Sequence, residues 1–277
     1  MKRLQHFMAR AGAWLLGVAV FMAAPLSASA QEPDGPTIVQ NCDYKNPGSD
    51  QRSKLTITLK DKDNNERTNI YLRLWKDYKG QDKIADKMVL FTEYPPDARG
   101  AGFMRWGFTA DTDKNADQWI YLPVLRKTRR VSIRDPGDSF LGSDLTYADI
   151  SGRAVDQDEH KFIKIEQKDG QDYYMVESIP KEKNPLYSKR VSWFLKAADW
   201  QGCVKSGVLY YDPKGELLKK QSLAWQKVGD AWMWKKVEVQ NVQTKHFSLF
   251  QIDEAEVNVG LDDEIFTERT LAKGYTR

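Results

Sequence analysis

Apolar and polar residues alternate in short segments along most of the chain. In the first of these, Leu55, Ile57 and Leu59 are separated by threonine residues and followed by a lysine. A period of two residues places such side chains on opposite faces of a β-strand. The same pattern, rich in β-branched and aromatic residues, predicts further strands. They are expected at 69–78, 87–93, 102–109, 118–123 and 128–134.

Turn-forming residues divide the second half of the chain into a series of hairpins. Asp169–Gly170, Asp212–Gly215, Gly229–Asp230 and Gln243–Lys245 separate runs that have strand character. Tight turns of this kind require antiparallel neighbours, because parallel strands need long crossovers. The chain is therefore expected to be mostly β and antiparallel. The predicted strands of this half are 161–168, 172–179, 207–211, 216–228, 231–242 and 246–252.

Only short helical segments are predicted. Pro36 is well placed to start a helix over 36–41, because proline is favoured in the first turn. The segment 139–150 breaks the strand pattern and is expected to form a helical insert. Asp262 is expected to cap a final turn near the end of the chain.

Several strands carry apolar residues on both faces. Leu72 and Leu74 share one face of the segment 69–78, and Tyr71 and Trp75 share the other. A sheet that is apolar on both faces must be covered on both, or must line a cavity with one. We predict a cavity, with an ordinary sandwich or barrel core as the alternative. The predicted lining residues are Leu72, Leu74, Phe91, Met104, Trp106, Tyr121 and Trp193.

The segment 126–134 is strongly basic. Along a strand, Arg129 shares a face with Val131 and Ile133, which places it among apolar side chains. We predict that Arg129 projects into the cavity and anchors a lipid head group or lid carbonyls through its fork of donors. The alternative is an ordinary solvated strand face.

The first thirty residues have the pattern of an export signal. Three basic residues precede an apolar stretch at 11–26, and Ala28 and Ala30 occupy the small-residue positions of a cleavage site. This pattern predicts a signal peptide over 1–30, cleaved near Ala30, and a periplasmic location. An uncleaved membrane anchor is the alternative. No cysteine closely follows the apolar stretch, so the exported chain is not expected to be a lipoprotein itself.

Charge is balanced once the signal is removed. The chain has 42 Lys and Arg and 39 Asp and Glu, and the excess of basic residues lies in the first thirty positions. A neutral chain lacks the basic footprint of nucleic-acid-binding proteins. With 41% hydrophobic residues in 277, the chain is apolar and long enough for a folded core. Residues 31–277 are expected to form one domain without a nucleic-acid partner.

Two cysteines, Cys42 and Cys203, lie in the exported part of the chain. An oxidising compartment favours a disulfide between them, with two free buried thiols as the alternative. The bond would close a loop of about 160 residues, for which the chain-entropy model gives a stabilisation of about 5 kcal/mol.

The residues that usually carry catalysis form no familiar motif. There is no G-x-S-x-G, no H-E-x-x-H, no glycine-rich phosphate loop and no calcium loop. His160 and His246, the histidines outside the signal, lack partners at the spacing of a zinc site. The sequence therefore predicts no enzyme, no metal site and no cofactor.

Four segments resemble a known family in order and spacing. They are QWIYLPVLRKTRRV at 118–131, SFLGSDLTYADI at 139–150, YSKRVSWF at 187–194 and VGLDDEIFTERTL at 259–271. They are similar to LolA-like outer-membrane lipoprotein-sorting proteins, in the longer branch found with RND-type transporters. The resemblance implies a strongly curved antiparallel sheet, an incomplete β-barrel closed by short helices. Its concave apolar cavity would receive acyl chains, which makes residues 31–277 a single lipid-binding domain.

Within such a fold, the segment 139–150 is predicted to be a lid that moves. Phe140, Leu141 and Leu145 are apolar and would cover the mouth of the sheet, with Asp149 at the polar edge. A short insert is not stable alone and must dock on another surface. A fixed structural loop is the alternative.

The resemblance implies a periplasmic carrier that shuttles lipid or lipoprotein acyl chains between the inner and outer membranes. Contact with a membrane would be transient. The alternative is an accessory subunit that binds or regulates an RND-type inner-membrane transporter. A lipid hydrolase is a third hypothesis, and the missing nucleophile and base motifs weigh against it.

Overall fold

Antiparallel strands make up most of the part of the chain that the structure describes. The computed structural model describes residues 32–112, 114–131, 137–151 and 153–275. The strands are β1 (Asp50–Lys60), β2 (Glu66–Asp77), β3 (Ile84–Tyr94), β4 (Gly102–Phe108), β5 (Asp117–Leu122), β6 (Lys127–Val131), β7 (Asp158–Lys168), β8 (Gln171–Pro180), β9 (Lys189–Leu195), β10 (Lys205–Tyr211), β11 (Leu217–Val228), β12 (Ala231–Asn241) and β13 (Phe247–Val257). The α-helices are α1 (Gly35–Cys42) and α2 (Glu268–Lys273).

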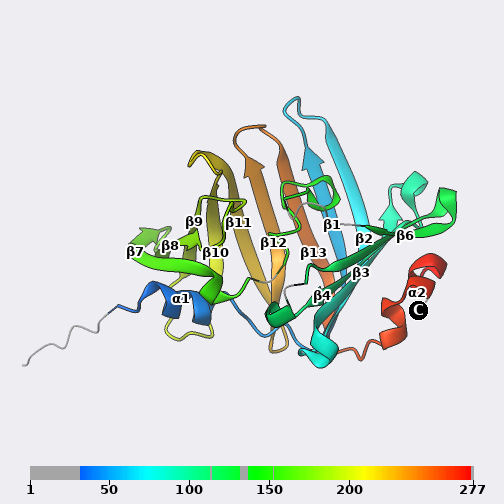
Figure 1. Ribbon diagram of the computed structural model, residues 1–277, viewed down its shortest axis with the longest axis horizontal. Coiled ribbons are helices and arrows are strands. Elements are labelled where there is room, and N and C mark those ends of the chain that lie inside the picture. The colour runs from blue at the N-terminus through cyan, green and yellow to red at the C-terminus, as the bar shows by residue number, and fades with distance from the viewer. Residues whose placement is uncertain (1–31, 113, 132–136, 152, 276–277) are drawn as a thin grey trace, which may run out of the picture. The chain divides into compact units, whose positions relative to one another are not determined.

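All of these strands belong to one sheet, in the order β6-β5-β4-β3-β2-β1-β13-β12-β11-β10-β9-β8-β7. Strands that follow each other in the chain are neighbours, except β6 and β7, which lie at opposite edges; at the centre, β1 pairs with β13. The sheet is strongly curved and not closed, with β6 and β7 at its two edges (Figure 1). The mostly β, curved antiparallel architecture predicted from the sequence is therefore confirmed.

Both faces of this sheet bury apolar side chains. On one face, named the cavity face below, Leu55 and Leu90 belong to a core that also includes side chains of the connection 137–151. We name this connection the roof segment. On the opposite face of β2–β5, Leu74 and Met104 pack against the C-terminal segment 261–275. Each apolar face of these strands is thus covered by a segment that is not a strand.

The helices follow the local sequence signals only in part. Helix α1 has Pro36 in its first turn, and the side chain of Asp34 accepts a hydrogen bond of 2.9 Å from the Thr37 amide. Asp262 caps a 3₁₀ turn over Asp263–Phe266, as predicted. The predicted helix over 139–150 is wrong: only one 3₁₀ turn, Phe140–Gly142, forms there.

The reason lies in the backbone of the roof segment. Leu141 has a φ of 52° and Gly142 a φ of 77°, both in the left-handed region, which cannot continue a right-handed helix. The chain turns back instead, so that Ser139 and Thr146 form an isolated antiparallel bridge. Ser143 therefore closes a turn here, through its hydrogen bond to the Phe140 carbonyl.

The predicted disulfide is present. Cys42, the last residue of α1, is bonded to Cys203, which lies just before β10. Both side chains are buried in a small apolar cluster that includes Ile38 and Phe194. The bond therefore ties the first helix to the β8–β10 part of the sheet.

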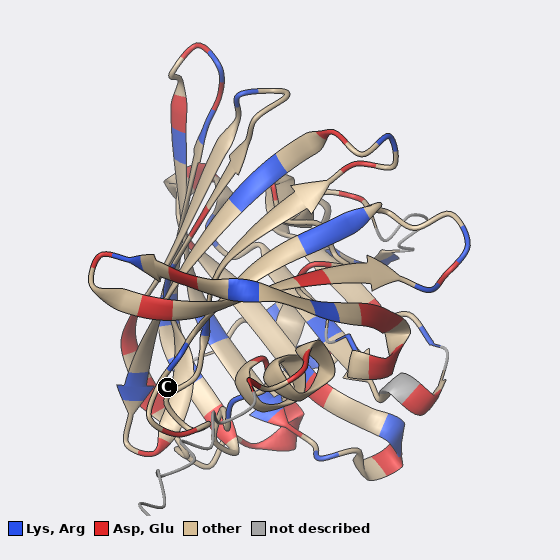
Figure 2. Ribbon diagram, turned by 90° about the vertical axis from the view of Figure 1, so that its left-hand side faces the viewer, with Lys and Arg blue, Asp and Glu red and all other residues tan. Residues whose placement is uncertain are grey.

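Charged side chains are spread over the strands and turns with both signs interspersed. Figure 2 shows lysine and arginine close to aspartate and glutamate along the visible strands. This distribution agrees with the balanced charge of the chain beyond residue 30.

Candidate functional site

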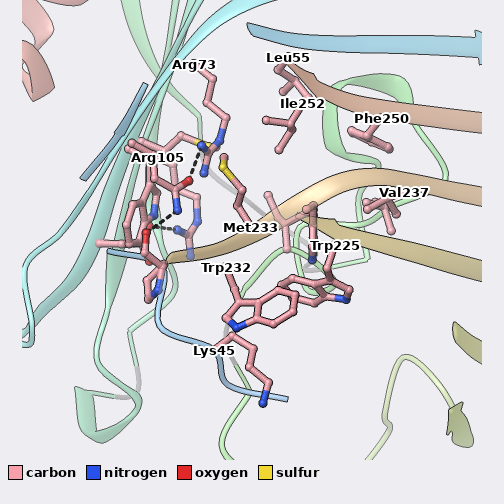
Figure 3. A pocket seen from close by; sticks show the side chains of 18 of the residues that line it. Lys45, Leu55, Arg73, Arg105, Trp225, Trp232, Met233, Val237, Phe250 and Ile252 are labelled. Carbon is pink, nitrogen blue, oxygen red and sulfur yellow. Dashed lines mark hydrogen bonds and ion pairs between the residues drawn. The ribbon is translucent and has the colours of Figure 1, made fainter. Parts of the chain in front are cut away.

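An apolar cavity of about 420 Å³ lies on the cavity face of the sheet. Strands β1, β12 and β13 supply its aliphatic and aromatic wall, and the roof segment closes it with Phe140, Leu145 and Ile150. Figure 3 shows Val237, Phe250 and Trp225 on one side and two arginines on the other. Volume and composition are those of a site for a small apolar ligand. The apolar lining residues are Leu55, Trp75, Met88, Phe140, Leu145, Ile150, Trp225, Trp232, Met233, Trp234, Val237, Phe250 and Ile252.

Polar side chains occupy the β2–β4 side of this cavity. An Arg105 Nη1–Asp86 Oδ1 ion pair of 2.7 Å joins β4 to β3, and the Arg105 side chain is 8% exposed. Arg73 on β2 donates a 2.8 Å hydrogen bond from Nη1 to Gln51 Oε1. Burial lowers the pKa of Arg73 to about 10, against a smaller opposing effect of Asp86. The guanidinium still carries its charge at neutral pH.

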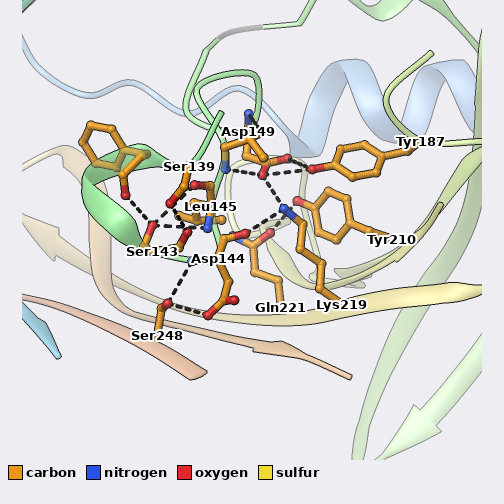
Figure 4. A network of polar contacts seen from close by, with 12 residues as sticks. Ser139, Ser143, Asp144, Leu145, Asp149, Tyr187, Tyr210, Lys219, Gln221 and Ser248 are labelled. Carbon is orange, nitrogen blue, oxygen red and sulfur yellow. Dashed lines mark hydrogen bonds and ion pairs between the residues drawn. The ribbon is translucent and has the colours of Figure 1, made fainter. Parts of the chain in front are cut away.

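The roof segment is fixed to the sheet by buried polar contacts. Lys219 on β11 forms a 2.5 Å ion pair with Asp149, in which both side chains are at most 3% exposed. The same ammonium donates to the Asp144 carbonyl at 2.8 Å, and Tyr187 donates to Asp149 at 3.0 Å. Burial, together with the Asp149 charge, raises the pKa of Tyr187, so its hydroxyl keeps its proton. The prediction that Asp149 lies at a polar edge is therefore wrong (Figure 4).

A second set of contacts holds the middle of the roof segment. The Asp144 carboxylate accepts from Ser248 Oγ at 2.6 Å and lies 2.7 Å from His246 Nδ1, both near the start of β13. Ser143 Oγ donates to the Phe140 carbonyl at 2.7 Å, which closes the turn. Phe140 itself makes edge-to-face contacts with the rings of Phe103 and Tyr147. In this state the roof segment is well anchored.

A second hollow, of about 320 Å³, adjoins the apolar cavity on the β7–β11 side. We name it the polar pocket. It shares Trp225 and Trp234 with the cavity, so these two rings contribute to both walls. His160 contacts Ser178 Oγ and the Val155 carbonyl there, and burial lowers the pKa of His160 against the effect of the Val155 hydrogen bond.

The arginines of the polar pocket have carboxylate partners. Asp158, whose side chain is 4% exposed, pairs with both Arg153 and Arg190, and Arg153 also contacts Glu182. Opposite charges thus balance each other in this pocket, in contrast to the apolar cavity.

The predicted cavity-lining residues lie on the wrong face. Leu74, Phe91 and Met104 are buried against the C-terminal segment, with Leu72, Trp106 and Tyr121 partly buried beside them. Trp193 also does not line the cavity or the polar pocket, although its neighbours Ser192 and Phe194 line the latter. The strands were located correctly, but a period-2 pattern with two apolar faces does not say which one is enclosed. The cavity uses the alternate residues, such as Trp75 and Met88.

Arg129 is exposed on edge strand β6 and does not line the cavity. It does belong to the cavity face, because the register continues from Leu90 through Phe103 and Ile120 to Arg129. The solvated-face alternative is therefore the correct one. The arginines that line the cavity are instead Arg73 and Arg105, and Arg105 is buried.

The lid residues are placed as expected, at the roof of the cavity. Phe140 and Leu145 are 4% and 1% exposed and line the cavity, and Leu141 packs against the same core. Opening of the roof segment stays a prediction.

Comparison with known proteins gives the family. A family model described only as an uncharacterized protein matches residues 85–273. A crystal structure of a domain from Vibrio parahaemolyticus assigned to outer-membrane lipoprotein sorting is 27% identical, covering 86% of this chain and 98% of that chain with a TM-score of 0.72. A DUF1329 family protein from Desulfovibrio piger is 24% identical, covering 85% and 95%, also with a TM-score of 0.72. No curated protein sequence matches.

The fold is also that of a LolA superfamily protein from Nitrosomonas europaea, at 18% identity and a TM-score of 0.60, covering 86% of this chain and 99% of that chain. The chain belongs to the family matched over residues 85–273, and its structural neighbours are outer-membrane lipoprotein-sorting, DUF1329 and LolA superfamily proteins. The resemblance found in the sequence is confirmed as far as the family, while the link to RND-type transporters is untested.

Membrane-crossing helices and metal-binding clusters are both absent from the part of the chain that the structure describes. No helix in it combines the length and the hydropathy that membrane crossing requires. Nor do its histidine, cysteine and acidic side chains come together in a group of three or more that could hold a metal ion.

Proposed function

We propose that the protein is a periplasmic carrier that holds an acyl chain of a lipid or lipoprotein in the apolar cavity and moves it between the inner and outer membranes. The observation that carries the proposal is the cavity itself, which is walled by four tryptophans and enclosed by the roof segment. An acyl chain buried there is removed from water, and this hydrophobic effect is the main driving force for binding. Similarity to a domain assigned to lipoprotein sorting supports the same function.

The proposed location rests on separate observations. Residues 1–30, which lie outside the described residues, have the pattern of an export signal. The Cys42–Cys203 bond fits an oxidising compartment such as the periplasm. Residues 31–277 would then be the mature lipid-binding domain.

The direct test is native mass spectrometry of protein isolated from the periplasm. We expect an added mass of one lipid per chain. Met233 lies at the centre of the cavity (Figure 3), so Met233→Trp should fill the space and lower lipid affinity about tenfold. Ile179→Trp, at an exposed position of β8, is the control and should bind as the unmodified protein does. Lipid-free protein would instead favour the accessory role at an RND-type transporter.

We further propose that membrane contact is made by the turn between β5 and β6. Leu122, Val124 and Leu125 are 38%, 90% and 46% exposed there, although they are apolar. The basic residues of β6, with Arg126 just before it, follow directly and would face anionic lipid head groups. Both features favour brief contact with a lipid surface.

Replacing Val124 and Leu125 by aspartate should lower binding to vesicles of phosphatidylglycerol at least tenfold, because apolar contact is lost and repulsion is added. Vesicle co-sedimentation measures this. Ile179→Asp, also exposed and apolar but on β8, should leave binding unchanged. Equal loss in both variants would place the membrane contact elsewhere.

A further inference from the structure

We infer that the apolar cavity selects amphiphiles carrying one anionic group, a carboxylate or a phosphodiester, and that Arg73 binds this group with Arg105 beside it. This inference rests on the proposed carrier function, because it names the class of cargo. It adds a chemical requirement that an apolar cavity alone would not impose.

The charges that line the cavity do not balance. Three cations and two anions face it: Lys45, Arg73, Arg105, Asp43 and Asp86. Asp43 pairs with Lys205 at 2.5 Å, and Asp86 pairs with Arg105. The ammonium of Lys45 donates to two backbone carbonyls, those of Asn41 and Trp200. Lys45 and Arg73 are therefore the cavity-lining cations without an ion pair among the lining carboxylates, and Arg73 is the one that lies beside Arg105.

The partners of Arg73 are neutral. Its Nη1 donates to Gln51 Oε1 at 2.8 Å and lies 3.5 Å from Ser53 Oγ. Within the described residues, no carboxylate oxygen lies within 4.0 Å of its guanidinium nitrogens. A guanidinium offers five N–H donors, and holding it away from water without an anion costs free energy. Burial accordingly lowers the Arg73 pKa to about 10.

Arg105 adds an unused donor beside the same space. Its side chain is 8% exposed and lines the cavity, and its Nε has no hydrogen-bond partner among the described residues. The neighbouring Gln118, paired with Arg105 across β4 and β5, is also buried with both amide atoms unpartnered. Most buried polar atoms in proteins have a partner, and Arg105 Nε, on a cavity-lining side chain, is a donor that a polar group of a ligand can use.

Backbone register brings the two arginines to the same place. Arg73 on β2 is opposite Leu90, and Arg105 on β4 is opposite Met88. Leu90 and Met88 are two residues apart on β3 and therefore share a face, so both arginines flank this strand on the cavity side. Figure 3 shows their guanidinium ends close together at the edge of the apolar wall.

Gly107 leaves the room that this cluster needs. A Cβ atom at this position would lie 2.8 Å from Asp86 Oδ2 and 2.9 Å from Arg105 Nη1. A larger residue would push the ion pair away from the strand. The glycine in an otherwise apolar strand is thus explained by the charged pair beside it.

The polar pocket does not compete for the anion. Its lining holds three cationic and three anionic side chains, which are Arg153, Arg190, Lys205, Asp43, Asp149 and Asp158. Asp158 pairs with both arginines, Asp43 with Lys205, and Asp149 with the buried Lys219. An anionic group gains more binding free energy beside Arg73, because Arg73 has no carboxylate partner.

Tryptophan fluorescence gives a direct test, since Trp75, Trp225, Trp232 and Trp234 line the cavity. The quencher is 9,10-dibromostearate, and the competitors are stearate, stearyl alcohol and lysophosphatidylglycerol at pH 8. We expect at least one anionic competitor to bind about tenfold more tightly than the alcohol, because charge-assisted hydrogen bonds are added. Which anion binds more tightly distinguishes a free fatty acid from a phospholipid as the source.

Arg73→Met should reduce the affinity for the anionic competitors about tenfold, to that of the alcohol, and leave the affinity for the alcohol unchanged. Unchanged alcohol binding also shows that the variant is folded. Arg73→Lys keeps the charge without the fork and should retain part of the preference. Arg129→Gln removes one positive charge from the same face but outside the cavity, and should bind like the unmodified protein.

The outcomes separate this inference from the proposed function. If the alcohol binds as tightly as both anions, or if Arg73→Met leaves the preference intact, the selection for an anion is wrong and the carrier function still holds. If none of the amphiphiles binds, the carrier function itself is overturned.

Discussion

Lys219→Met is expected to lower the free energy of unfolding by about 3–5 kcal/mol, because it leaves the Asp149 carboxylate buried without its cation. Both side chains of this pair are at most 3% exposed. The same change removes the hydrogen bond to the Asp144 carbonyl and the ammonium placed over the rings of Tyr187 and Tyr210. Denaturant unfolding followed by tryptophan fluorescence measures the loss.

Two further variants test whether the lost stability comes from the broken buried ion pair. Lys220→Met removes the same charge one residue later, at an exposed position of β11, and should change stability by less than about 0.5 kcal/mol. Lys219→Met combined with Asp149→Asn should recover part of the loss, since no uncompensated charge remains. If breaking the Asp149–Lys219 pair leaves the free energy of unfolding unchanged, this pair does not hold the roof segment.

The same buried contacts oppose opening of the roof segment. A roof segment anchored by a buried ion pair and by Asp144 opens rarely unless cargo or a partner offsets the lost contacts. A disulfide engineered between the roof segment and the sheet should block lipid uptake until it is reduced. Uptake at the unchanged rate would leave the roof segment as a fixed structural loop.

Removing the native disulfide is the other large expected effect. The double variant Cys42→Ser and Cys203→Ser should lose about 5 kcal/mol, the chain-entropy value for a loop of this length. The two cysteines are 161 residues apart in sequence and at most 1% exposed. Thermal and urea unfolding of the oxidised protein and of the variant give the difference. Unfolding midpoints that coincide would show that packing around α1, rather than the bond, holds the first helix.

The sequence predicts the features that depend on residues close together in the chain, and it fails where a feature depends on distant segments. Hairpins such as β7–β8, joined at Asp169–Gly170, were located correctly because turn chemistry and alternation act within a few residues. The choice of the cavity face failed because it depends on two distant segments. The roof segment covers one face and the C-terminal segment the other, and a strand apolar on both sides fits either.

The strands nevertheless contain a sequence feature that marks the site, which is an arginine between apolar residues. Arg73 stands between Leu72 and Leu74, and Arg105 between Met104 and Trp106. A charged residue inside a strand that is otherwise apolar is costly unless its face meets something polar. Arg129 lies in a dense basic run, and such a run at a sheet edge is simply solvated.

The pairing of β1 with β13 determines at which stage of folding the cavity can form. Ile57 lies beside Phe250, so the central seam of the sheet joins residues from near the two ends of the described chain. Contacts of such long sequence separation slow folding, because loop closure precedes the energetic gain. The cavity has walls on both sides of this seam. Until β13 is available to pair with β1, the two halves of the sheet stay unjoined, and the cavity that they wall is incomplete.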